Sequence, residues 1–300
     1  MKVTNREKYD LDTAIKMYNS VGCRNGDYLF RWLYNIYKFS YISSVDPTYR
    51  EILTLDKTKL TIVDVLIDDL ADNYELRNQE LLEKAVRIPW NPKKKYRHKY
   101  LEVTRKIWLE CMKSIKHYPR YNEFKELFFF DLDQVLDSAR YSFLVNTMEI
   151  DNELENRLYI HHGTMVIMHL DMDLMCSPNF NKNELWKLRP VMHYVQDVCH
   201  IGNMLNTYPR EINERDLSSP IISLGLRKGL ITKEDIIKDP EKAIERLRKL
   251  EPYFKKRVEE NLKKIEKHAK DLESVDLNEF SRKLRRVFKC FLKRKYYWEK

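Results

Sequence analysis

The sequence predicts an all-α protein, because helical periodicity recurs along most of it and neither alternating strands nor internal repeats occur. Only 6 glycines and 10 prolines occur among 300 residues, too few for a Gly-rich nucleotide fold or a turn-rich all-β chain. Hydrophobic residues make up 43% and aromatic residues 12%, so the chain can bury a core and wholesale disorder is excluded. We therefore expect one all-α domain of about ten helices spanning residues 1–300.

The expected helices follow from apolar and aromatic side chains that recur three and four positions apart. An aromatic helix is expected at 27–39, and residues 60–86 continue in the same manner. Residues 240–270 are helical and highly charged, with a kink at Pro252 and a solvated outer face. Further helices are expected at 96–117, 132–149, 154–175, 183–206 and 276–298.

Charge and cysteine content bound the setting in which the protein works. Lys and Arg number 55 against 46 Asp and Glu, and the resulting net charge of +9 fits an anionic ligand. The five cysteines are scattered and form no CxxC, which predicts reduced thiols in a cytoplasmic protein and no disulfide framework or zinc site. No signal peptide opens the chain and no apolar run approaches the roughly 18 residues of a membrane span, so no stable membrane insertion is expected.

An acidic cluster closes one of the apolar helical runs. In TIVDVLIDDLADNYE, Asp68, Asp69 and Asp72 form a DDxxD pattern, and the i, i+4 spacing places Asp68 and Asp72 on one helical face. Carboxylates so close repel one another unless a cation compensates them, and such hard oxygen ligands suit Mg²⁺. Taken alone, the motif fits a solvated acidic helix end equally well.

A second set of oxygen ligands lies in IGNMLNTYPREINERD. Asn203, Thr207 and Glu211 recur at i, i+4 and i+8, so one helical face presents an amide oxygen, a hydroxyl and a carboxylate. Pro209 inside this set removes a helical donor, which predicts a kink or an end of the helix before Glu211. Two such faces across a helical bundle would clamp a diphosphate between metal ions.

Together these motifs resemble the aspartate-rich DDxx(D/E) motif and the later N-x₃-S/T-x₃-E triad of the microbial class I terpene synthases, or terpene cyclases. The resemblance covers most of the chain, roughly from the aromatic helix at 27–39 to Tyr297. Met204 departs from it, because the family usually has an acidic residue there. The resemblance implies a single-domain helical bundle with a central cavity, three magnesium ions as cofactor, and a prenyl diphosphate substrate.

The same resemblance assigns diphosphate-binding residues outside the two motifs. Arg157, one long helix upstream of the triad, matches the family's diphosphate-sensing arginine, and Arg210 matches a basic residue beside the triad glutamate. The family's C-terminal Arg-Tyr pair has its nearest equivalent in Arg294, Tyr296 and Tyr297, where a lysine interrupts it.

The activity that the resemblance implies is that of a carbon–oxygen lyase of isoprenoid biosynthesis. Such an enzyme ionises an allylic C15 or C20 prenyl diphosphate, cyclises the carbocation and releases diphosphate. The resemblance implies no nucleic acid as partner, and it is compatible with a homodimer. Contacts to the diphosphate strengthen as negative charge accumulates on it, which promotes ionisation. Aromatic faces stabilise cations, and the first aromatic helix offers Phe30, Trp32, Tyr34 and Tyr37.

Two alternatives stay open at this point. A prenyl-chain-joining synthase of the squalene or phytoene type shares the fold and the diphosphate chemistry, but it would need a second aspartate-rich motif. A non-enzymatic, basic, helical nucleic-acid-binding protein would explain the net charge but not the two ligand faces. We further expect His161, His162 and Gly163 to lie in the cavity wall or the core, with a helix break at Gly163.

Overall fold

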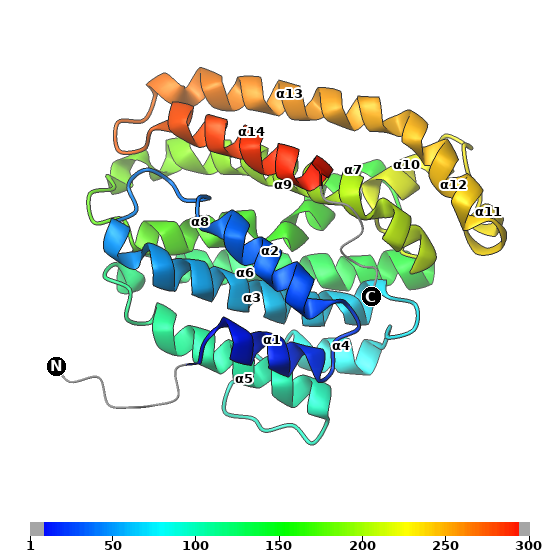
Figure 1. The fold of residues 1–300 in the computed structure, drawn as a ribbon, viewed down its shortest axis with the longest axis horizontal. Coiled ribbons are helices and arrows are strands. Elements are labelled where there is room, and N and C mark those ends of the chain that lie inside the picture. The colour runs from blue at the N-terminus through cyan, green and yellow to red at the C-terminus, as the bar shows by residue number, and fades with distance from the viewer. Residues whose placement is uncertain (1–8, 294–300) are drawn as a thin grey trace.

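In the computed structural model, which describes residues 9–293, every element of regular structure is helical (Figure 1). The predicted all-α class is therefore confirmed for that range, and no helix in it is long and apolar enough to cross a membrane. The α-helices are α1 (Leu11–Asn19), α2 (Gly26–Tyr37), α3 (Arg50–Asp72), α4 (Gln79–Ala85), α5 (Lys99–Ile115), α6 (Tyr121–Met148), α7 (Glu153–Tyr159), α8 (Val166–Met175), α9 (Leu185–Asn213), α10 (Pro220–Arg227), α11 (Lys233–Lys238), α12 (Pro240–Leu247), α13 (Glu251–Lys267) and α14 (Leu277–Lys293).

Two long helices form the centre of the molecule. Helix α3 packs against α2, α5 and α6, while α9 packs against α8, α13 and α14. The main hydrophobic core runs through both groups, from Ala14 of α1 to Leu284 of α14. Helix α13 lies on the outside of this arrangement, and it buries Phe254, Val258 and Leu262 while its charged residues face outward, as its pattern predicts.

The predicted helix at 60–86 is wrong in its extent. Helix α3 begins earlier, at Arg50, and it ends at Asp72, where Asn73 adopts an extended ψ of 118°. The side-chain oxygen of Asn73 accepts from the backbone N–H of Glu75 at 2.9 Å, an Asx turn that competes with helix continuation. The side chain of Asn78 then caps α4 by accepting from the N–H of Leu81.

The expected helix at 154–175 is also divided. A 3₁₀ turn from Ile160 to Thr164 separates α7 from α8, and Met165 follows it in the left-handed region with φ 56°. The break predicted at Gly163 therefore occurs. The 3₁₀ turn makes α7 and α8 separate helices, and nearly all of α8 is buried whereas α7 buries Asn156.

Pro209 and Pro252 stand at different places in their helices. Helix α9 continues through Pro209 to Asn213, so the predicted end of the helix before Glu211 is wrong. The carbonyl of Pro209 accepts from the side-chain amide of Asn213, one turn later on the helix. The predicted helix at 240–270 is divided into α12 and α13 by a 3₁₀ turn from Arg248 to Leu250, and Pro252 follows in the first turn of α13, where proline is tolerated.

Helix α14 covers α9 through close packing at one glycine. A Cβ on Gly202 would lie 3.0 Å from the ring of Phe291 and 3.1 Å from that of Phe288. Leu284, Val287 and Phe291 are buried, which confirms the apolar face expected for the last helix. The absence of a side chain at position 202 thus lets α14 approach α9 closely.

Candidate functional site

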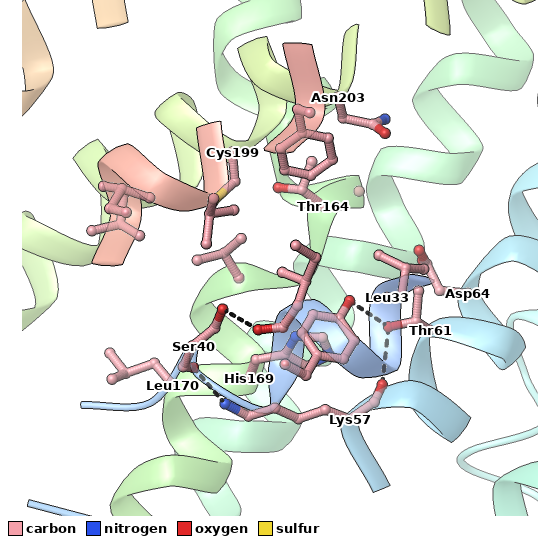
Figure 2. A pocket seen from close by; sticks show the side chains of 18 of the residues that line it. Leu33, Ser40, Lys57, Thr61, Asp64, Thr164, His169, Leu170, Cys199 and Asn203 are labelled. Carbon is pink, nitrogen blue, oxygen red and sulfur yellow. Dashed lines mark hydrogen bonds between the residues drawn. The ribbon is translucent and has the colours of Figure 1, made fainter. Parts of the chain in front are cut away.

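A cavity of about 180 Å³ lies between α2, α3, α8, α9 and α14 (Figure 2). Polar side chains occupy two regions of its wall. Arg24, Asp64, Asp68 and Asn203 belong to the first, and Lys57, His169 and Asp173 belong to the second. Much of the wall between them is apolar and includes Leu29, Leu33, Val65, Val195, Leu284 and Val287.

A row of carboxyl groups follows α3 at the first polar end. Asp64, Asp68 and Asp72 stand at i, i+4 and i+8, and the first two line the cavity. Burial, reinforced by Asp69 and Asp216, raises the pKa of Asp68 to about 6, although its side chain keeps 33% exposure through the cavity. Burial and the neighbouring Asp68 also raise the pKa of Asp64 well above its ordinary value.

Asp69, the remaining aspartate of the predicted motif, faces away from this row. Its side chain is fully buried and accepts from Nε of Arg24 at 2.7 Å, with Nη2 at 2.5 Å. The thiol of Cys23 also donates to it, at 3.4 Å. Asp69 is therefore half of a buried ion pair that joins α3 to the segment before α2, and the structure does not bring it to the cavity.

Asp72 lies where α3 meets the end of α9. The hydroxyl of Ser142, from α6, donates to its carboxyl group. Burial and the nearby Asp216 raise the pKa of Asp72 well above its ordinary value, and the amide of Asn146 donates to Asp216 at 3.0 Å. The side-chain amide of Asn73 donates to Glu214 at 3.3 Å, so the C-terminal ends of α3 and α9, which follow the two predicted motifs, are in contact.

The predicted triad lies on one face of α9, as its spacing requires. Asn203 lines the cavity, and the hydroxyl of Thr207 lies 2.9 Å from the carbonyl of Asn203 and also contacts Glu211. Glu211 is buried, and its Oε2 makes no hydrogen bond within the described part of the chain. Burial, with a contribution from Asp216, raises the pKa of Glu211 to about 7, while Nη2 of Arg210 lies 3.7 Å from Oε1.

The donor chemistry at this end fits the Mg²⁺ that the resemblance implies. Burial and neighbouring carboxyl groups raise the pKa of Asp68 and of Glu211 even though Arg24 and Arg210 lie nearby, and Oε2 of Glu211 has no hydrogen-bond donor among the described residues. Among the described residues, these carboxyl groups stand farther apart than the ligands of a single metal ion do. Among residues 9–293, no three His, Cys, Asp or Glu side chains are gathered closely enough to hold one.

The structure does not bring Arg157 to the cavity. It lies on α7, half exposed, in an ion pair with Glu153, and it lines a separate polar pocket with His161 and Arg257. Gly163 does line the cavity, whereas His162 approaches the side chain of Gln196. The remaining predicted residues, Arg294, Tyr296 and Tyr297, lie outside the described residues.

The aromatic helix contributes one ring to the described cavity wall. Tyr37 lines the cavity and its hydroxyl lies 3.0 Å from that of Thr61. Phe30 is buried edge-on against Tyr18, and Trp32 packs against Phe291 at a centroid distance of 5.1 Å. Tyr34 lies beneath the ammonium of Lys38, so Phe30, Trp32 and Tyr34 support the wall or the surface and do not line the cavity.

The second polar end of the cavity was not predicted. Nζ of Lys57 lies 2.6 Å from Oδ1 of Asp173, and both side chains are almost completely buried. Nζ also donates to the carbonyl of Ser40 at 3.3 Å (Figure 2). His169, also buried, packs edge-on against Tyr37 at a centroid distance of 4.9 Å.

Sequence reasoning missed Asp64 and Arg24 at the first end of the cavity, and Lys57 and His169 at the second. The spacing of Asp64, one turn before Asp68 in an apolar run, is a signal that could have found it. The same helical face continues back through Thr61 to Lys57. Arg24 and His169 carry no such signal, because only the tertiary structure brings their segments to α3.

Two comparisons with known proteins found no match for this chain. No protein-family model matches the chain, and no curated protein matches it. What indicates function is thus the chemistry and geometry of the residues at the cavity.

Proposed function

We propose that this protein is a class I terpene synthase that ionises an allylic prenyl diphosphate and cyclises the resulting carbocation. One observation carries the proposal: Asp64 and Asp68 of α3 and Asn203 of α9 line one end of a largely apolar cavity. Such a cavity offers both a polar anchor for a charged head group and an apolar space for a hydrocarbon chain.

The polar end would bind the diphosphate. Asp68, Asp72 and Glu211 would hold Mg²⁺, which supplies charge neutralisation for the leaving diphosphate when it is bound. Nη2 of Arg24 lies 3.8 Å from Oδ2 of Asp68, so a guanidinium already stands beside these carboxyl groups. Its charge stabilises the diphosphate more as the carbon–oxygen bond breaks, because negative charge then accumulates on the leaving oxygens.

The apolar part would shape the chain and exclude water. Leu33, Val65 and Val287 come from three different helices, so the contour depends on how α2, α3 and α14 pack. A carbocation survives only where water is excluded, and the cover that α14 places over α9 supports this requirement. The volume of about 180 Å³ lies below the roughly 300–1,000 Å³ of common ligand pockets, which favours the C15 over the C20 substrate.

The proposal is tested by incubating the full chain with Mg²⁺ and either C15 or C20 prenyl diphosphate. We expect diphosphate release that EDTA abolishes, together with cyclic hydrocarbon products of unchanged carbon number. A product of doubled carbon number would instead identify a chain-joining synthase. Failure to release diphosphate, combined with salt-dependent binding to RNA or DNA, would favour a nucleic-acid-binding protein.

A further inference from the structure

The far end of the cavity holds an unused base. His169 on α8 lines the cavity with only 6% of its surface exposed, and its Nε2 makes no hydrogen bond to any residue of the described range. A neutral imidazole carries one nitrogen lone pair that can accept a proton. Burial and the charge of Lys57 lower the pKa of His169 well below its ordinary value, so the ring stays neutral near pH 7.

Other polar groups at this end are already engaged. Asp173 pairs with Lys57 and also accepts from the N–H of Ile42 at 3.3 Å. The hydroxyl of Ser40 donates to the carbonyl of Ile36 at 2.8 Å. Farther along the wall, one turn before Asn203 on α9 (Figure 2), burial raises the pKa of the Cys199 thiol to about 12, so this group holds its proton and is no base.

The distance from the acidic end separates His169 from the diphosphate. Lys57, next to His169, and Asp68 stand eleven positions apart on α3, which corresponds to about 16 Å along the helix axis. In Figure 2, Asn203 likewise lies on the opposite side of the cavity from Lys57 and His169. A base at this position would reach carbons remote from the one that loses the diphosphate.

We propose that His169 accepts the proton that ends the carbocation reaction, an inference that rests on the proposed function. A C–H bond next to the cationic carbon breaks, its electron pair forms the new C=C bond, and the proton binds the imidazole lone pair. The products are a neutral olefin and an imidazolium. Burial beside Lys57 disfavours that imidazolium, which returns its proton to water when the product leaves.

The experiment compares the wild-type chain with His169→Phe and His169→Gln, using the C15 diphosphate and Mg²⁺. Diphosphate release and hydrocarbon products are measured separately, and a thermal melt checks that each variant folds. His200→Phe is the matched control, because it removes another histidine whose pKa burial lowers, one on α9 that does not line the cavity.

We expect both His169 variants to keep releasing diphosphate, because ionisation occurs at the other end. The main olefin should fall by about a hundredfold, the lower end of the contribution of a positioned acid–base group. Alcohols or olefins deprotonated elsewhere should replace it, while His200→Phe keeps the wild-type olefin as its main product. Diphosphate release with an unchanged olefin in a folded His169 variant would overturn this inference alone. No diphosphate release by the wild-type chain would overturn the proposed function and the inference together.

Discussion

Arg24 and Asp69 form a buried ion pair, with Nε of the guanidinium 2.7 Å from Oδ1 of the carboxylate. The two adjacent aspartates therefore have different roles: the ion pair holds Asp69 inside the protein, while Asp68 lines the cavity. Neighbouring carboxylates in one motif therefore offer a matched pair for mutagenesis, one structural and one at the site.

We expect Asp69→Asn to destabilise the protein and Asp68→Asn to abolish turnover. Losing the charge of Asp69 removes the nearest carboxylate from the buried Arg24 and leaves it only the more distant Asp68, 3.8 Å away, which costs on the order of 3 kcal/mol of unfolding free energy. Asp68→Asn removes a carboxylate that its neighbours repel, so its folding stability should be kept. Denaturant melts and diphosphate release measure the two effects. Normal turnover in folded Asp68→Asn would contradict the assignment of Asp68.

The acidic end predicts a specific pH dependence of stability. The pKa of Asp68 is raised to about 6 and that of Glu211 to about 7, so both bind protons more tightly folded than unfolded. Their contribution to stability is therefore present at low pH and is lost as pH rises from about 4 to about 7. In EDTA, the melting temperature of the wild-type chain should fall over that range, and Asp68→Asn should flatten the decline.

Added cation should reverse this trend. If Mg²⁺ with inorganic diphosphate binds the same carboxyl groups, it competes with their protons and binds more tightly as pH rises. The rise in melting temperature on adding both should be larger near pH 8 than near pH 5, and smaller in Glu211→Gln. An equal rise at both pH values would place the binding site away from Asp68 and Glu211.

Arg157→Lys distinguishes the sequence-based role of this arginine from its observed position. Its ion pair with Glu153 is half exposed, and such pairs contribute about 0–1 kcal/mol, so stability should change little. Because Arg157 does not line the cavity, we expect diphosphate release to be unchanged as well. A large loss of turnover would instead support the sensor role that the resemblance implies, by a movement of α7 toward the cavity.

The buried pair of Lys57 and Asp173 should behave as a unit. Lys57→Met leaves Asp173 as an uncompensated buried carboxylate and should cost about 3–5 kcal/mol of unfolding free energy. The double variant Lys57→Met, Asp173→Leu removes both charges and should recover much of that loss. Denaturant unfolding of these two variants, of Asp173→Leu alone and of the wild-type chain forms a double-mutant cycle. If the losses of unfolding free energy in the two single variants add up to the loss in the double variant, Lys57 and Asp173 are not directly coupled.

Helical periodicity predicted where helices lie but not where they end. The prediction of one helix over 60–86 missed the Asx turn at Asn73, because a single side-chain hydrogen bond outweighs a continuing apolar pattern. At Pro209 the opposite happened: tertiary packing of α9 kept the helix intact across a residue that breaks isolated helices. Helix ends depend on local hydrogen bonds and tertiary contacts, which composition and spacing do not report.

The sequence by itself determined the all-α class and the faces of single helices, since side chains i and i+4 share a face wherever the helix lies. Asp68 and Asp72 on α3, and Asn203, Thr207 and Glu211 on α9, therefore lie in rows as their spacing requires. Only the tertiary structure decided what these rows meet. The ion pair with Arg24 holds Asp69 away from the cavity, His169 of α8 lines the cavity, and Arg157 lines a separate pocket. Contacts between distant segments arise from how helices pack, and that packing depends on many side chains at once.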